Sequence, residues 1–365
     1  MKNRLNKKRT ALLIINVVLV LAALLCFLLI GRLSGEMLSQ KEAERWQSES
    51  ALSFSQSSIF FPHDALPGIN DIYSTRTKLT TKLHEAALDI DNSENLMVDA
   101  WSTVGSTNVS TGMGSATVSV IAVGGSFFDF HPLRLLSGSY ITETDLMQDR
   151  VLLDEELSWL LYGGTDLAGM SVNINGREFY IAGVISREED FATKHAYAGG
   201  MGLYMSYQAY SELYEDAGIN CYEIVMPEPV KNFSVTTLRS IYTDESVEIV
   251  SNTKRFGVPA LYKTATGLAK RSMQANGILY PYWENAARYS ESICAVLLLA
   301  ATAALLVPFI TAVVLIIRGA VSGKNKLEED IFPKAKDNVE EFFRRRGRKR
   351  YEKKEAKRKR ENGIS

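Results

Sequence analysis

Two long uncharged apolar runs, one near each end of the chain, most constrain how it can fold. Residues 11–30 (ALLIINVVLVLAALLCFLLI) form a run of 20, and residues 293–317 (ICAVLLLAATAALLVPFITAVVLII) form a run of 25. As a helix the first rises roughly 30 Å, the thickness of the hydrocarbon core of a bilayer. Core helices of soluble proteins seldom run this far without a charge, so both runs predict transmembrane helices. No A-x-A cleavage site follows the first run, which favours an uncleaved anchor over a signal peptide.

The charges of the chain are divided by these two runs. Residues 1–10 carry five Lys/Arg and no acid, and residues 318–365 carry seventeen Lys/Arg against nine Asp/Glu. The segment between them, residues 11–317, holds 19 basic and 33 acidic residues. Because basic flanks stay in the cytoplasm, we expect both termini there and the acidic middle outside.

The resulting organisation has five parts and one fold class. We predict two transmembrane α-helices that flank a mixed α+β extracytoplasmic domain at the cell membrane. The predicted parts are a cytoplasmic basic N-terminus (1–10), a first span (11–31), the outer domain (32–289), a second span (290–318) and a cytoplasmic basic tail (319–365). Cys221 is the only cysteine outside the spans, so the outer domain cannot form an internal disulfide. Its stability must come from a packed core.

Apolar periodicity predicts short alternating elements in the outer domain. Residues 69–87 repeat apolar side chains at three and four positions, as one face of a helix does. Asp154 is expected to cap a helix whose Leu157, Leu160 and Leu161 face inward, and Ser234 to cap another. Asn175-Gly176 is the clearest hairpin turn. Further strands are expected at 51–61, 96–104, 116–123, 151–153, 202–205, 221–226 and 247–250, and residues 35–46 are open to a continuation of the first membrane helix.

Residues with catalytic or metal-binding chemistry do not gather in any recognised pattern. Gly164-x4-Gly169 is followed by Met170 where a phosphate-binding loop needs lysine, so we interpret it as a turn. The four histidines (His63, His84, His131 and His195) lack zinc-ligand spacing and are interpreted as surface or loop residues. No nucleophile elbow is present. We therefore predict a protein that is not an enzyme and holds no metal or cofactor.

Two groups beside the second span are candidate contact residues. The tail concentrates basic side chains in Arg344, Arg345, Arg346, Arg348, Lys349 and Arg350. We expect such a cluster to contact anionic lipid or a protein partner. The main alternative is a solvated charged helix that only fixes the topology, and contact with nucleic acid is the weakest of the three. Tyr280, Tyr282 and Trp283 suit the outer membrane–water interface, and a packed edge of the core is an equal alternative.

Several segments of the outer domain resemble the MacB-like core domain of ABC transporter permeases, the group that includes FtsX- and LolC/E-like proteins. The likeness is carried by residues 123–128 (VGGSFF), 135–145 (LLSGSYITETD), 150–155 (RVLLDE), 161–170 (LYGGTDLAGM) and 172–184 (VNINGREFYIAGV). Two departures are Ser139, where the family pattern has arginine, and Met170, where it has lysine. In this order and spacing the segments cover residues 120–190 clearly and most of 45–285 more loosely.

The resemblance implies a fold and a role. Such permeases pass force between a cytoplasmic ATPase and an outer domain, and this chain carries no ATPase of its own. They usually have three spans after the outer domain, whereas one follows here, so the loop that meets the ATPase is missing. We therefore expect a non-catalytic permease-like subunit of an ABC-type export or envelope-remodelling complex, partnered by a separate ATPase, a fuller permease or both. The alternative is a stand-alone sensor or scaffold whose outer domain binds a peptide or a cell-wall component.

Overall fold

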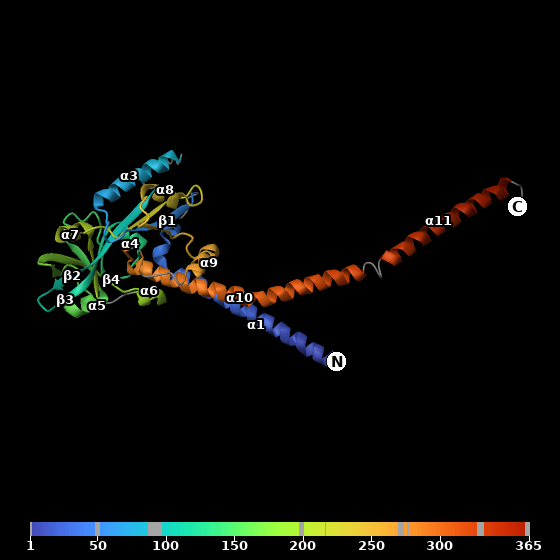
Figure 1. Ribbon diagram of the computed structural model, residues 1–365, viewed down its shortest axis with the longest axis horizontal. Coiled ribbons are helices and arrows are strands. Elements are labelled where there is room, and N and C mark those ends of the chain that lie inside the picture. The colour runs from blue at the N-terminus through green and yellow to red at the C-terminus, as the bar shows by residue number, and fades with distance from the viewer. Residues whose placement is uncertain are drawn as a thin grey trace. The chain divides into compact units, whose positions relative to one another are not determined.

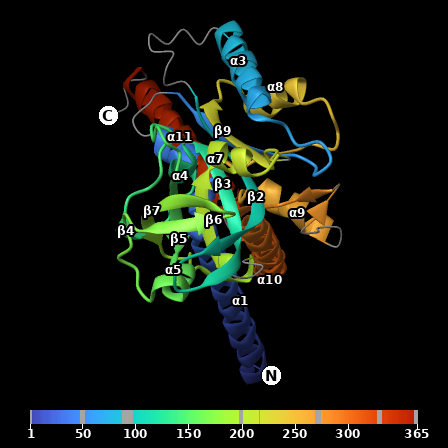
Figure 2. The same cartoon turned by 90° about the vertical axis from the view of Figure 1, so that its left-hand side faces the viewer.

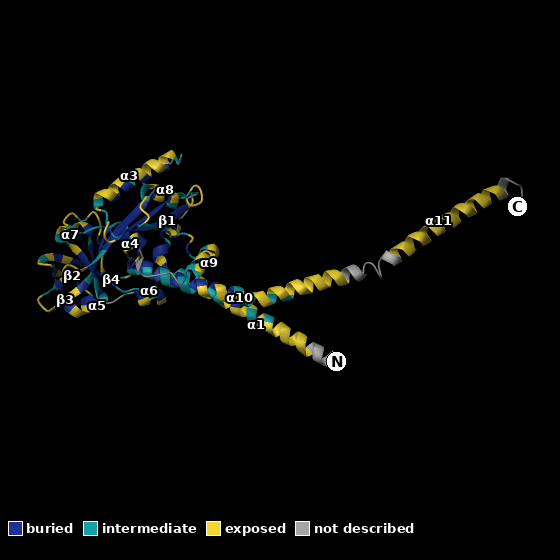
Figure 3. Ribbon diagram, in the orientation of Figure 1, coloured by how far each residue is buried: buried dark blue, intermediate teal, exposed yellow. Residues whose placement is uncertain are grey.

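The computed structural model describes residues 2–47, 52–86, 97–196, 201–215, 217–268, 274–275, 277–326 and 332–361. The two apolar runs lie within helices α1 (Lys2–Glu36) and α10 (Tyr282–Lys326), and both helices are long and apolar enough to cross a membrane. Most apolar side chains of α1 between Leu12 and Leu29 are exposed (Figure 3), as lipid-facing residues of a span would be. Two candidate membrane helices thus flank a mixed α+β domain, as the sequence predicts.

The elements of the outer domain alternate along the chain (Figure 1). The strands are β1 (Phe54–Phe60), β2 (Val98–Ser110), β3 (Ser115–Gly125), β4 (Leu135–Gly138), β5 (Arg150–Asp154), β6 (Ser171–Ile174), β7 (Arg177–Ile185), β8 (Gly202–Ser206), β9 (Cys221–Pro227), β10 (Glu248–Ser251), β11 (Gln274–Ala275) and β12 (Ile278–Leu279). The helices are η1 (Leu38–Gln40), α2 (Glu42–Gln47), α3 (Ile69–Glu85), α4 (Phe127–Phe130), α5 (Glu155–Tyr162), α6 (Phe191–Ala196), α7 (Tyr207–Leu213), α8 (Phe233–Ile241) and α9 (Val258–Gly267). After α10 comes α11 (Phe332–Glu361).

One mixed sheet of ten strands organises the outer domain. Its order is β10-β1-β9-β2-β3-β8-β5-β7-β4, and the pairs β3–β8 and β5–β7 are parallel. The short strand β6 pairs with both β7 and β2, so the strands from β2 to β7 close into a ring through it. Closure protects most of these strands from having an open edge.

Both faces of the sheet are buried, because alternate residues of the central strands enter two separate cores. In β5, Val151 and Leu153 pack into the first core and Leu152 into the second. Helices α3, α5, α7 and α8 cover the first core (Figure 2), and α2, α4 and the start of α10 contribute to the second. The second face of the sheet is therefore the one that contacts the segments joined to the membrane helices.

The Asn175-Gly176 turn confirms the strongest local prediction. Both residues have positive φ (49° and 88°), and they join β6 to β7 in antiparallel register. Glycine adopts this backbone conformation without steric cost. The segment from Gly163 to Gly169 likewise forms a turn between α5 and β6.

Four local predictions were wrong or too short. Leu160 is 54% exposed, because Leu157 and Leu161 are the two leucines of α5 that face the core. Ser234 lies inside α8 and is buried, while Asn232 precedes the helix in the left-handed region. Strand β2 continues through the polar residues after Val104 because β3 pairs with it as far as Ser110. Helix α1 ends at Glu36 and does not continue to residue 46.

Other expected boundaries are not tested. The predicted ends at Ala51, Ala87 and Leu96 lie outside the described residues. The exact limits of the spans, 11–31 and 290–318, remain predictions, because both helices extend past them in each direction.

Asp154 gives a test of how β5, α5 and β8 are held together. Its carboxylate accepts hydrogen bonds from the backbone N–H groups of Leu157 and Gly202, both at 2.7 Å, and from Arg187 at 2.9 Å. Asp154→Ala removes the helix cap and leaves buried donors unpaired, so we expect a loss of about 3 kcal/mol in the free energy of unfolding. Thermal unfolding of the purified chain measures it. Asp166→Ala, in an exposed turn, is the matched control, and equal midpoints for the two variants would contradict this role of Asp154.

Candidate functional site: a buried charged junction

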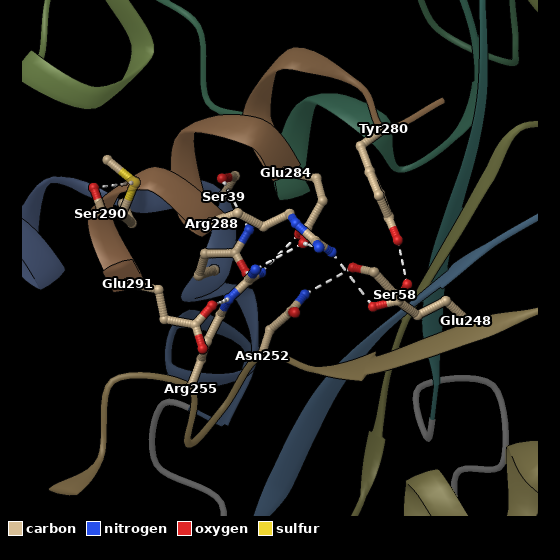
Figure 4. Close-up of polar contacts among 12 residues, drawn as sticks. Ser39, Ser58, Glu248, Asn252, Arg255, Tyr280, Glu284, Arg288, Ser290 and Glu291 are labelled. Atoms are coloured by element: carbon tan, nitrogen blue, oxygen red, sulfur yellow. Dashed lines mark hydrogen bonds and ion pairs between the residues drawn. The ribbon is translucent and has the colours of Figure 1, made fainter. Parts of the chain in front are cut away.

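A buried arginine joins the outer domain to the start of α10. Arg255 follows β10 and is 5% exposed. Its guanidinium donates to both carboxylate oxygens of Glu284 at 2.6 and 2.7 Å, in a bidentate pair (Figure 4). Its Nε donates to Glu291, two turns further along α10, at 3.0 Å. The arginine is therefore clamped to two positions on one side of the helix.

The same arginine reaches the segment that follows α1. Its Nη1 donates to Oε1 of Gln40 in η1 at 3.1 Å. Gln56 of β1 donates to the backbone oxygen of Ser39 at 2.7 Å and accepts from the backbone N–H of Glu42 at 3.0 Å. Residues that follow the first membrane helix and residues that open the second are thus tied to the sheet at one place.

Helix α9 closes the junction from another side. Thr264 donates to the second carboxylate oxygen of Glu291 at 2.8 Å. Leu261 packs with Cys294 and Leu298 of α10, and Ile30 and Leu33 of α1 lie against the same cluster. We call the set Gln40, Arg255, Glu284 and Glu291, with its partner Thr264, the charged junction.

A second polar chain runs parallel to the charged junction. Arg288 of α10 lies 3.4 Å from Glu248 of β10, and Tyr280 donates a hydrogen bond to that same glutamate. Arg288 also stacks over the ring of Tyr280, 4.3 Å from its centroid. Arg288 also lies 3.9 Å from Glu284, so this second set of contacts fixes the first turns of α10 to the edge strand β10 and meets the charged junction at Glu284.

Burial and ion pairing act in opposite directions on the groups of the junction. Burial raises the pKa of Glu284 above its ordinary value, although Arg255 acts to lower it. Burial alone would lower the pKa of Arg255, but the carboxylates of Glu284 and Glu291 outweigh it and raise that pKa above its ordinary value. Burial, together with the hydrogen bond to Glu248, raises the pKa of Tyr280. The junction is thus permanently ionised at neutral pH on its cationic side, and each buried charge has a partner.

This arrangement fixes the start of α10 to the loop after β10, beside a cavity of about 560 Å³ that Arg255, Glu284 and Glu291 help to line. Bidentate hydrogen bonds fix orientation as well as distance, so a shift of α10 along its axis must move Arg255 and the strand end that carries it. Within the described parts of the chain, no group of three or more His, Cys, Asp or Glu side chains could hold a metal ion. The geometry joins the outer domain to the start of α10 through paired, buried groups.

The predicted aromatic group lies at the domain end of α10. Tyr280 and Trp283 are each 3% exposed, which leaves almost no surface for lipid headgroups and matches the packed-edge alternative. Trp283 packs against Phe127 and His131 in the second core. Tyr282 is partly exposed, and its place at a membrane–water interface stays a prediction.

One histidine differs in part from its predicted setting. His131 is buried, and its Nε2 lies 2.5 Å from a carboxylate oxygen of Glu223. His131 lies in the loop after α4, as one of the two predicted settings had it, but it is not at the surface. An isolated histidine between polar and apolar residues gives no sign of a distant buried carboxylate. Glu223 also accepts from Ser58, which extends this polar contact into β1.

The basic group of the tail lies in α11 and is exposed along its length (Figure 3). Arg345 pairs with Glu341 one turn earlier, at 2.7 Å. Exposure leaves the other members of the predicted contact group (Arg344, Arg346, Arg348, Lys349 and Arg350) accessible to lipid or to a protein, and neither contact is tested.

Sequence reasoning missed the charged junction. Glu284 and Glu291 stand seven residues apart just before an apolar run, which places both on one helix face and could have marked a buried polar surface. Arg255 has no comparable signal, because it lies in a loop 29 residues from Glu284 and its burial depends on the folded sheet.

Comparison with known proteins places the chain in a family. The family model for the MacB-like periplasmic core domain matches residues 10–239, which is more than half of the chain. The chain belongs to this family. None of the curated proteins matches it.

Two solved structures are similar at low identity. One is the periplasmic region of MacB from Actinobacillus actinomycetemcomitans, at 18% identity and a TM-score of 0.39, covering 60% of this chain and 93% of that one. The other is the extracellular domain of the noncanonic ABC-type transporter YknZ from Gram-positive bacteria, at 13% identity and a TM-score of 0.36, covering 53% of this chain and 99% of that one.

Loss of Arg255 should be costly because it leaves two carboxylates buried without a counter-charge. We expect Arg255→Met to lower the free energy of unfolding by about 3–5 kcal/mol, and the triple variant that adds Glu284→Gln and Glu291→Gln to recover part of that loss. Thermal unfolding of the full chain in detergent is the measurement. The neighbouring exposed Lys254→Met removes the same charge and should change little. A triple variant no more stable than Arg255→Met would contradict a coupled buried network.

Proposed function

We propose that this chain is a non-catalytic permease-like subunit of an ABC-type export or envelope-remodelling complex. Its outer domain would transmit movement between the membrane helices and the extracytoplasmic side, or engage a substrate there. Membership of the MacB-like periplasmic core domain family supports the permease-like role. The observation that carries the mechanical part is the clamp of Arg255 onto Glu284 and Glu291, which ties the sheet to α10 through buried charges.

The proposed partner is a separate ABC ATPase subunit, a fuller permease, or both. Membership of the MacB-like periplasmic core domain family supports a partner of this kind. The basic face of α11 is the proposed contact, either with that partner or with anionic lipid at the membrane surface. From Arg344 to Arg358 the tail carries ten Lys/Arg and two Glu, and each basic residue near anionic lipid contributes about 1 kcal/mol of attraction.

Affinity purification in a mild detergent tests the partner. We expect the full chain to recover an ABC ATPase or a permease with several spans, identified by mass spectrometry. Removal of residues 332–361 should lower that recovery at least tenfold if α11 holds the partner, whereas unchanged recovery with weaker retention on anionic vesicles would assign α11 to lipid. Met113→Ser, at an exposed hairpin tip, is the control. If the intact chain recovers neither class of protein, the stand-alone sensor or scaffold becomes the better hypothesis.

The proposed topology places both termini in the cytoplasm and the outer domain outside. In a background with all three cysteines replaced by serine, we expect Met113→Cys to react in intact cells with a maleimide that cannot cross membranes. Tyr351→Cys, exposed on α11, should react only after the cells are opened. Labelling of Tyr351→Cys in intact cells would reverse the assignment.

A further inference from the structure

A groove crosses the outer domain beside α4. It consists of two adjoining cavities of about 330 and 490 Å³ that share Gly125, Phe128, Ile141, Thr142 and Glu143 as lining residues. The combined space is in the range of sites that hold small molecules or short peptide segments. The groove lies apart from the charged junction, which contributes none of its lining residues.

Aromatic side chains form one wall of the groove. Trp101 of β2 lies against β3 because Gly124 opposite it has no Cβ, and a Cβ there would overlap the indole ring. Tyr73 of α3 contacts Trp101 edge to face at 6.2 Å, and Phe128 stacks on Tyr140 at 4.7 Å. The guanidinium of Arg76 already lies over the rings of Tyr73 and Trp101, 5.8 and 5.1 Å from their centroids. The remaining ring surface is suited to apolar groups of a ligand.

Carboxylates from separate segments surround this wall and outnumber the cations. Asp99 is neutralised by Arg76, whose Nε lies 2.6 Å away, and Asp145 lies 3.3 Å from Arg150. Glu143 accepts a hydrogen bond from the backbone N–H of Gly125 at 2.6 Å.

Two lining carboxylates are not held in ion pairs, although Arg76 lies close enough to Glu143 for their charges to interact. In the part of the chain that the structure describes, neither Glu143 nor Asp129 forms an ion pair, and both residues are exposed. The lining of the two cavities contains four carboxylates and two arginines, and this negative excess beside aromatic rings favours a positively charged ligand.

We propose that this groove binds a basic, amphipathic peptide segment, in which an ammonium or guanidinium group is adjacent to an apolar side chain. The cation meets Glu143 and Asp129, and the apolar side chain packs on Tyr73, Trp101 and Phe128. This names the class of ligand that the outer domain engages, and in that sense it rests on the proposed function.

The groove is in contact with both segments that lead to the membrane helices. Helix α4 contributes Phe128 to the groove, and its neighbour Phe127 packs against Trp283 of α10 with ring centroids 5.5 Å apart. Arg45 of α2 donates to the backbone oxygen of Asp129 at 2.7 Å. A ligand that displaces α4 therefore acts directly on the start of α10 and on the helix after α1.

Calorimetric titration of the full chain in zwitterionic nanodiscs tests the site, with empty nanodiscs as the blank. The probe is a capped hexapeptide of alternating Phe and Lys, and the comparison peptides alternate Phe with Glu and Ser with Lys. We expect saturable binding of the Phe–Lys peptide that weakens as salt is added, and at least tenfold weaker binding of the other two.

Two double variants with the same change in charge distinguish binding in the groove from non-specific attraction of the peptide to an acidic domain. Glu143→Gln with Asp129→Asn should weaken binding of the Phe–Lys peptide at least tenfold. Tyr73→Ala should weaken it several-fold, and Glu178→Gln with Asp166→Asn, an equal charge change at exposed positions, should leave it unchanged. Thermal unfolding checks that each variant is folded.

Each result has a defined meaning. Equal binding of the Phe–Glu peptide, equal loss in both paired variants, or no saturable binding of the Phe–Lys peptide would overturn the groove proposal. Recovery of an ATPase together with any of these results leaves the proposed function standing, whereas peptide binding without a recovered ATPase or permease contradicts the complex and keeps the site.

Discussion

The buried guanidinium of Arg255 is the interaction on which the connection between outer domain and membrane helices depends. An unpaired charge at this depth would cost several kcal/mol, so the chain must bring Glu284, Glu291 and Gln40 to it whenever the domain is folded. Those partners come from the start of α10 and from the segment after α1. Folding of the sheet and positioning of the two helix ends are therefore one event, because neither can be completed without the other.

The two faces of the sheet pack against different parts of the chain, and only one of them contacts the elements next to the membrane helices. One core, under α3, α5, α7 and α8, stabilises the domain from the side away from the charged junction. The other core includes Trp283 of α10, Ala43 of α2 and Phe127 of α4, so the elements next to the membrane helices are part of the hydrophobic interior. The start of α10 is consequently held by dense packing as well as by the ion pairs of Arg255.

The surroundings of α10 change along its length, from the interior of the outer domain to an exposed apolar surface. Its first turns place charged and polar groups (Glu284, Ser290 and Glu291) into the domain, while its later residues expose a continuous apolar surface. A single helix can serve both environments because its buried carboxylates, Glu284 and Glu291, are paired with Arg255 before the apolar run begins. The aromatic residues at this boundary, Tyr280 and Trp283, accordingly pack into the domain.

Local patterns in the sequence were sufficient for several features of this protein. Uncharged length identified the two membrane helices, the Asn175-Gly176 pair identified the hairpin turn, and Asp154 identified a helix cap, since each depends on residues close together in the chain. Ordered family motifs then identified the outer domain.

Tertiary structure alone decided the rest. The extension of β2 past Val104 needed its partner β3, the burial of His131 needed Glu223, and the clamp on α10 needed an arginine from a distant loop. The reason is physical: turns, caps and apolar length are properties of neighbouring residues, whereas a buried charge is stable only beside a partner that the fold alone can bring to it.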